Sequence, residues 1–212
     1  SVKEFSNIKI RDKEFLLLKS YFKEQRDRVK NKEELETRLI LVETEIFFNE
    51  KKYNYAMDTI NYGLEKYKDN GSFLYTRALV AEKIDRLDIL ESDLKKLIKM
   101  EPNNAQAMNA LGYTWANNNI NLSKAHEYID KALAILPNDA AILDSKGWVL
   151  YKLGKYKSAE SYFVKALKIS QDTEIVSHFI KLLIKLKKLD RAKQIYARYI
   201  KISPQDENLI QL

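Results

Sequence analysis

The chain contains no cysteine, three prolines and five glycines among its 212 residues. Without cysteine it cannot form disulfides, thiolate zinc sites or a cysteine nucleophile. Sheet proteins with many tight turns need more glycine, because glycine adopts a positive φ most easily, so an all-β fold is disfavoured. No apolar run approaches the roughly 20 residues that a membrane-spanning helix needs. With 45% hydrophobic residues, the chain is expected to fold around a buried core.

The basic residues are unevenly distributed along the chain. The formal net charge is +7, and charges of opposite sign balance over residues 1–150. Residues 151–212 carry the whole excess, with 13 Lys and Arg against 6 Asp and Glu. A basic end can attract nucleic acid, an anionic lipid surface or an acidic protein. A solvated helical face explains the same charges, and we favour that interpretation.

Small residues recur at a nearly constant spacing. Gly112 and Gly147 are 35 residues apart, and Ala125 and Ala159 are 34 apart. Aligned on these positions, the segments also match at several apolar places, and Pro102 and Pro137 close successive units. A period of about 34 residues, with small residues at the eighth, twentieth and twenty-seventh places, resembles the tetratricopeptide repeat. Large side chains at the first two of these places would hold the paired helices of a unit apart.

This resemblance implies an all-α fold, a right-handed solenoid of helix-turn-helix repeats with a concave groove. We expect one array over residues 1–212, with a partial unit at 1–34, repeats at 35–70, 71–104, 105–139, 140–173 and 174–206, and a tail or short helix at 207–212. The expected helices lie near residues 12–30, 33–49, 53–67, 71–83, 87–100, 104–117, 122–135, 139–153, 156–169, 173–186 and 189–202. The aromatic ring of Trp115 is expected in the core.

The sequence lacks the patterns of catalytic, cofactor and metal sites. It has no phosphate-binding glycine loop, no HExxH pair and no GxSxG elbow. Its two histidines, His126 and His178, fall in different repeats, whereas a metal site needs several converging ligands. We therefore predict no enzyme activity, no cofactor and no bound metal.

The first helix of each repeat is expected to line the groove. Aromatic anchors beside hydrogen-bonding groups suit an extended peptide or a partner helix. The alternative is that the aromatic side chains pack between neighbouring repeats. The residues predicted to face the groove are Tyr75, Asn109, Tyr113, Asn117, Asp144, Trp148, Tyr151, Lys152, His178 and Lys185.

Two strings resemble one bacterial subfamily more closely. Asn109-Ala-Leu-Gly-Tyr-Thr114 and Leu143-Asp-Ser-Lys-Gly-Trp-Val149, followed by His178, are similar to the C-terminal repeats of proteobacterial outer-membrane tetratricopeptide lipoproteins. That group includes the lipoprotein partner of a carboxyl-terminal processing protease. The resemblance covers most of residues 35–205. The family usually has a Leu-Gly pair after the histidine, where this chain has Phe179, Ile180 and Lys181.

This closer resemblance implies a periplasmic scaffold that docks a protease or another envelope enzyme. The full-length protein would be tethered to the outer membrane by a lipid anchor upstream of Ser1, and a cytoplasmic location is the alternative. The competing function is nucleic-acid or anionic-surface binding through residues 151–212. We do not expect nucleic acid as a partner, because few aromatic side chains interleave with the lysines for base stacking. Self-association through the segment Phe15–Phe22 is compatible with the scaffold.

Overall fold

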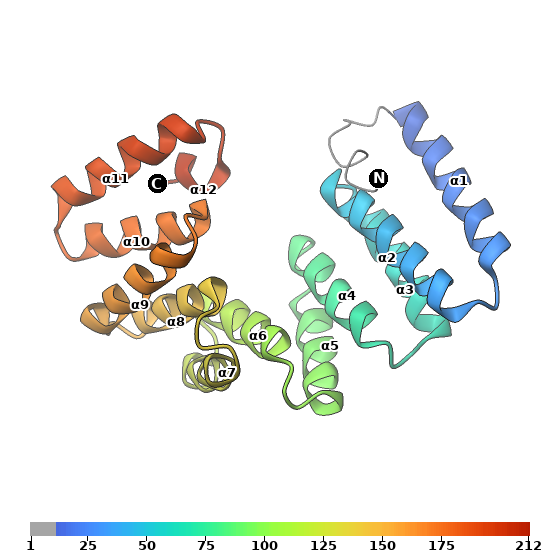
Figure 1. Cartoon of the computed structure of the whole chain (residues 1–212), viewed down its shortest axis with the longest axis horizontal. Coiled ribbons are helices and arrows are strands. Elements are labelled where there is room, and N and C mark those ends of the chain that lie inside the picture. The colour runs from blue at the N-terminus through green and yellow to red at the C-terminus, as the bar shows by residue number, and fades with distance from the viewer. Residues whose placement is uncertain (1–11) are drawn as a thin grey trace. The chain divides into compact units, whose positions relative to one another are not determined.

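The computed structural model describes residues 12–212, and the regular elements in this part are α-helices (Figure 1). The chain divides after Met100 into two compact units. Unit 1 contains α1 (Asp12–Val29), α2 (Glu33–Asn49), α3 (Tyr53–Lys66), α4 (Gly71–Lys83) and α5 (Leu87–Met100). Unit 2 contains α6 (Ala105–Asn117), α7 (Leu122–Ile135), α8 (Ala140–Lys152), α9 (Tyr156–Ile169), α10 (Thr173–Lys185), α11 (Leu189–Ile202) and α12 (Glu207–Ile210).

The expected all-α class and helix positions are confirmed, with ends that differ by one residue at most. Part of the predicted tail at 207–212 forms the short helix α12. The expectation of one uninterrupted array over residues 1–212 stays a prediction, and the two units are described separately. None of the described helices combines the length and apolar character that crossing a bilayer requires.

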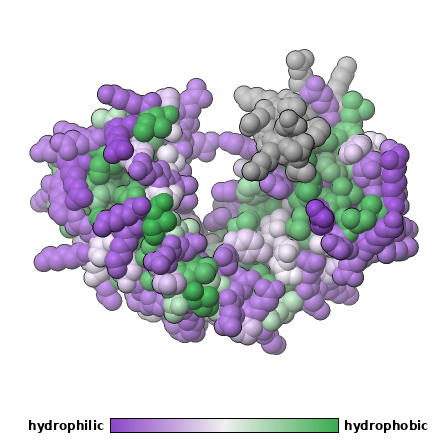
Figure 2. Space-filling model, in the orientation of Figure 1, coloured by the Kyte–Doolittle hydropathy of each residue, from purple (hydrophilic) through white to green (hydrophobic). Residues whose placement is uncertain are grey.

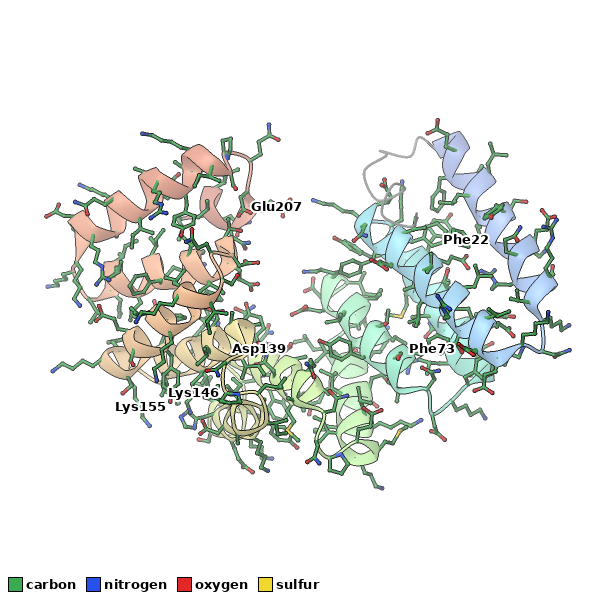
Figure 3. The ribbon with its side chains drawn as sticks, in the orientation of Figure 1. Phe22, Phe73, Asp139, Lys146, Lys155 and Glu207 are labelled. Atoms are coloured by element: carbon green, nitrogen blue, oxygen red, sulfur yellow. The ribbon has the colours of Figure 1, made fainter. Side chains whose placement is uncertain are left out.

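Asparagine or aspartate side chains begin the first helix of most repeats. The carboxamide of Asn104 accepts a hydrogen bond from the Ala107 backbone N–H at 2.9 Å, and Asp139 caps Ile142 in the same way at 2.9 Å (Figure 3). Asn70 and Asp172 cap α4 and α10. Each cap satisfies a backbone donor that has no partner within the helix. Local sequence therefore fixes where these four first helices start.

A left-handed residue stands in each turn between the two helices of a repeat. Its φ is 57° at Lys51, 55° at Asp85, 55° at Asn119, 74° at Gly154 and 59° at Lys187. Only glycine adopts this conformation without steric cost. The chain therefore makes its tight helical turns with few glycines, and it accepts a small strain in most repeats.

Close contact between paired helices explains the repeated small residues. A Cβ at Gly112 of α6 would lie 2.7 Å from Ile129 and 2.9 Å from the carbonyl oxygen of Ala125 on α7. A Cβ at Gly147 of α8 would lie 2.7 Å from the ring of Phe163 on α9. On α7, the buried Ala125 faces Gly112. The helices approach so closely because these positions carry no larger side chain.

The first helices of successive repeats also contact one another. In unit 2, α8 contacts both α6 and α10, and in unit 1, α2 contacts α4. We call the surface that these first helices share the inner face of each unit. The second helices α7 and α9 pack against the first helix of the next repeat. Trp115, which was expected in the core, is 2% exposed and packs edge-on against Tyr128 of α7.

Helix α1 packs on α2 as the second half of a repeat would. The rings of Phe15 and Phe22 lie 5.3 Å and 6.4 Å from the ring of Phe47 (Figure 3). The opposite side of α1 leaves Leu16 63% exposed and Leu17 71% exposed. Self-association through this helix stays a prediction.

The glycine contacts give a stability prediction. Gly112→Ala should lower the free energy of unfolding by about 1–2 kcal/mol, because the new methyl group meets a backbone oxygen that cannot move aside, although alanine favours the helix. Urea unfolding followed by circular dichroism measures the change. Ser123→Ala, on the exposed side of α7, is the matched control and should stay within about 0.5 kcal/mol of wild type. An unchanged Gly112→Ala protein would contradict this account of the helix contact.

Candidate binding site

The inner face of unit 2 centres on a stack of three rings. The indole of Trp148 lies 5.0 Å from the ring of Tyr151 at an interplanar angle of 5°, and 4.1 Å from the ring of His178 at 17°. Tyr151 lies one helical turn from Trp148 on α8, whereas His178 comes from α10. The stack therefore joins two consecutive repeats through their first helices.

Several predicted groove residues form the packed layer of this face. Asp144, Trp148 and His178 are 4%, 5% and 4% exposed. Little of their surface is open to a partner, and Trp148 packs between repeats, which is the alternative that the sequence left open. Their role in the described structure is to hold α8 and α10 together beneath the accessible surface.

A buried hydrogen bond links Asp144 to His178. Oδ2 of the carboxyl group lies 2.8 Å from Nδ1 of the imidazole. Burial raises the pKa of Asp144 above its ordinary value, and the bond to His178 opposes that rise. Burial dominates because the surrounding rings exclude the water that would stabilise a carboxylate.

Two lysines lie over the stack. Nζ of Lys152 is 4.8 Å from the centre of the Trp148 ring, and Nζ of Lys181 is 5.8 Å from it. Lys152 also donates a hydrogen bond of 3.2 Å to the carbonyl of Asn117, which ties α8 to the end of α6. Burial lowers the pKa of Lys152, and the charge of Lys181 lowers it further. Two cations thus share one aromatic surface.

The remaining predicted residues are more accessible. Tyr113 on α6 is half-buried, and its hydroxyl donates a 2.5 Å hydrogen bond to Glu174 at the start of α10. Tyr151 and Lys152 are also half-buried. Asn117 and Lys185 are exposed at the ends of α6 and α10. Within the described part of unit 2, the accessible portion of the predicted site is therefore an aromatic and cationic surface.

The first helices also carry buried polar atoms without a partner. Among residues 12–212 there are four such side-chain atoms: Oγ1 of Thr37, Oδ1 of Asn109, Oδ1 of Asp144 and Nε1 of Trp148. All four belong to first helices, namely α2, α6 and α8. Native proteins pair most buried polar atoms, so each unpaired atom needs an explanation. An ordered water within the packed layer is the usual partner of such an atom.

Unit 1 has an open groove on its own inner face, between α2 and α4. Its volume is about 310 Å³, and its lining includes the half-buried side chains of Leu41, Phe48 and Leu79. We call it the α2–α4 groove, lined by Leu41, Thr44, Glu45, Phe48, Thr76, Leu79 and Val80. Tyr75, the predicted groove residue of this repeat, is half-buried on α4 next to Thr76.

The sequence prediction missed the contribution of α2 to this groove. The predicted groove residues begin at Tyr75, so they include none from the repeat at 35–70. The same places one repeat earlier fall on Leu41, Glu45 and Phe48, because Thr44 occupies the eighth place there. The signal was present in the repeat register.

Most cations of the basic end are spread over α9–α11, and some are paired. Lys188, just before α11, and Arg191 of α11 both bind Glu160 of α9, at 2.7 Å and 3.3 Å. The buried Lys146 of α8 pairs with Asp130 of α7 and lies 2.9 Å from Nε2 of His126 on the same helix as Asp130 (Figure 3). Figure 2 shows hydrophilic side chains over most of the visible surface of unit 2, with hydrophobic patches between them. Among residues 12–212, no group of three or more His, Asp or Glu side chains is placed to hold a metal ion.

Comparisons with known proteins agree on the fold. Residues 150–212 match the model of a family described as tetratricopeptide repeat. TPR repeat-containing protein PA4667 of Pseudomonas aeruginosa is 42% identical over 140 residues, which make up 66% of this chain and 24% of the relative. The chain thus spans about a quarter of the length of the curated relative that it matches.

Solved structures show the same architecture at low sequence identity. A tetratricopeptide-repeat protein of Thermus thermophilus is 21% identical, with a TM-score of 0.71, over 78% of this chain and 91% of that one. A tetratricopeptide-repeat protein of Parabacteroides merdae is 18% identical, with a TM-score of 0.73, over 91% of this chain and 73% of that one. The chain therefore has the fold of tetratricopeptide-repeat proteins, which generally mediate protein–protein interactions.

The raised pKa of Asp144 predicts how stability depends on pH. Between the ordinary value of 3.8 and the raised folded-state pKa, the folded chain binds a proton that the unfolded chain has lost. The contribution of this group to the free energy of unfolding therefore falls as pH rises through that window, and it is constant above it. Asp144→Asn should remove this pH-dependent contribution. The free energy of unfolding of the variant, relative to that of the wild type, should therefore increase with pH from about 4 upward.

Urea unfolding at several pH values measures both slopes. Asp58→Asn, at an exposed position on α3, is the matched control and should keep the wild-type slope. Equal slopes for wild type and Asp144→Asn would show that burial does not raise this pKa.

Proposed function

We propose that this tetratricopeptide-repeat chain is a non-catalytic scaffold that docks a protein partner on the inner faces of its repeats. The observation that carries the proposal is the accessible surface formed by Tyr113, Tyr151 and Lys152 on the inner face of unit 2, which lies over the buried stack of Trp148 and His178.

The accessible surface of unit 2 has the chemistry of a docking site. Tyr113 and Tyr151 offer aromatic area, and each has a polar tip. Lys152 adds a cation whose position is fixed by the carbonyl of Asn117 and by the ring of Trp148. A pre-positioned side chain loses little conformational entropy when a partner binds, which favours affinity. Trp148 supports this surface from beneath.

For the partner, we propose a protease or another enzyme of the bacterial envelope, with the full-length protein tethered to the outer membrane on its periplasmic side. The support is the similarity of Asn109–Thr114 and Leu143–Val149 to outer-membrane tetratricopeptide lipoproteins. These strings supply Tyr113 and Trp148, so the resemblance falls on the inner face of unit 2. The groove side chains, rather than the fold, determine which protein binds.

Affinity capture tests the docking surface. The chain is immobilised and exposed separately to envelope and cytosolic fractions of its source cells, with washes at low and high salt. Lys152→Glu should reduce recovery of an envelope partner about tenfold, because it reverses a fixed charge at the centre of the surface. Lys168→Glu, at an exposed position on the second helix α9, makes the same charge change and should leave recovery unchanged.

The other outcomes separate the alternatives. Equal loss with both variants would indicate an effect of net charge and would contradict docking on the inner face. Recovery of a partner from the cytosolic fraction alone would contradict the envelope location. Capture of nucleic acid that is lost steeply with salt would favour binding through the basic end instead.

A further inference from the structure

The α2–α4 groove of unit 1 has the dimensions of a site for side chains. Its volume of about 310 Å³ lies at the low end of the roughly 300–1,000 Å³ of small-molecule sites. On α2 the lining runs from Leu41 to Phe48, a length of about 10 Å at the helical rise. An extended peptide covers that length with about three residues. The side chains at positions i and i+2 of an extended segment therefore fit the length of the groove.

The walls of the groove are mainly apolar. Leu41, Phe48 and Leu79 are each only half-buried, so part of each side chain remains open to the groove. Thr44 donates its hydroxyl to the carbonyl of Ile40 at 2.7 Å, so its polar group is already paired within α2. Covering this surface with apolar side chains would remove it from water.

One carboxylate sets the charge of the groove. Glu45 is an exposed member of the lining, and no ion pair joins it to another described side chain. The buried glutamates of the same helix differ, because Glu36 pairs with Lys66 and Glu43 pairs with Arg26. Their charges are already neutralised within unit 1. Glu45 is therefore positioned to attract a cation on an incoming partner.

We propose that the α2–α4 groove docks a short segment of a partner protein that carries two large apolar side chains beside a lysine or arginine. The apolar side chains fill the space between Leu41, Phe48 and Leu79, and the basic side chain pairs with Glu45. An acidic neighbour in the segment would be repelled by the same carboxylate, which gives specificity. The inference rests on the proposed docking function and specifies the partner chemistry for unit 1.

Synthetic peptides test the proposal on the whole chain. The probe is a fluorescent nine-residue peptide of Gly and Ser with two Leu at alternate positions and an adjacent Lys. One matched peptide has Glu in place of Lys, and another has Ser in place of both Leu. Fluorescence anisotropy should show that the Leu-Lys peptide binds. The Leu-Glu peptide should bind about fivefold more weakly, because it lacks the exposed ion pair with Glu45. The Ser peptide should not bind, because it lacks the apolar contacts.

Variants of the chain locate the site. Glu45→Lys should reverse the preference between the Lys and Glu peptides. Glu65→Lys, at an exposed position on the second helix α3, makes the same charge change and should preserve it. Leu79→Gln should weaken every Leu peptide, with circular dichroism confirming that the variant is folded. Analytical ultracentrifugation shows whether a second copy occupies the groove, which would appear as a dimer that Leu79→Gln dissociates and would overturn the proposal.

The proposal is also overturned if no Leu peptide binds at millimolar concentration, or if Glu45→Lys and Glu65→Lys behave alike. Failure here is distinguishable from failure of the proposed function. If capture on the inner face of unit 2 still depends on Lys152 while the peptides ignore Glu45, the scaffold function stands and only the partner chemistry of unit 1 is wrong.

Discussion

The close approach of two helix backbones within the α6–α7 and α8–α9 repeats is the constraint on which the structure of unit 2 depends. At Gly147 the space of a side chain is taken by the ring of Phe163, and at Gly112 it is taken by Ile129 and a backbone oxygen. With the paired helices so close, the second helix of one repeat can reach the first helix of the next. The rings of Phe163 and His178, from α9 and α10, lie 6.1 Å apart as a result.

The same packing divides the inner face of unit 2 into two layers. Trp148 and His178 stack beneath the surface, where they join two repeats. Tyr113, Tyr151 and Lys152 lie partly above them and remain accessible. The buried layer gives the accessible one a fixed base. Recognition and repeat packing therefore share side chains on α8, and a change at Trp148 affects both.

The sequence predicted the helices well and the site less well. Helix positions follow from local signals, such as the caps Asn104 and Asp139 and the spacing of small residues, so they are confirmed almost to the residue. The repeat register also indicated which helices line the inner face. It could not show that Trp148 and His178 stack on each other, because the distance between first helices depends on how consecutive repeats pack. The paired charges of Glu36 and Glu43 were hidden for the same reason.

The left-handed turn residues affect the stability of the repeats, whereas the choice of partner depends on other residues. Lys51, Asp85, Asn119 and Lys187 each hold a backbone conformation that costs an ordinary residue about 1 kcal/mol. Gly154 holds the same conformation without that cost. These turns join the two helices of a repeat, and none of the five residues lines the α2–α4 groove or lies over the Trp148 ring. Evolution can therefore raise or lower the stability of individual repeats at the turns while it changes the choice of partner on the first helices.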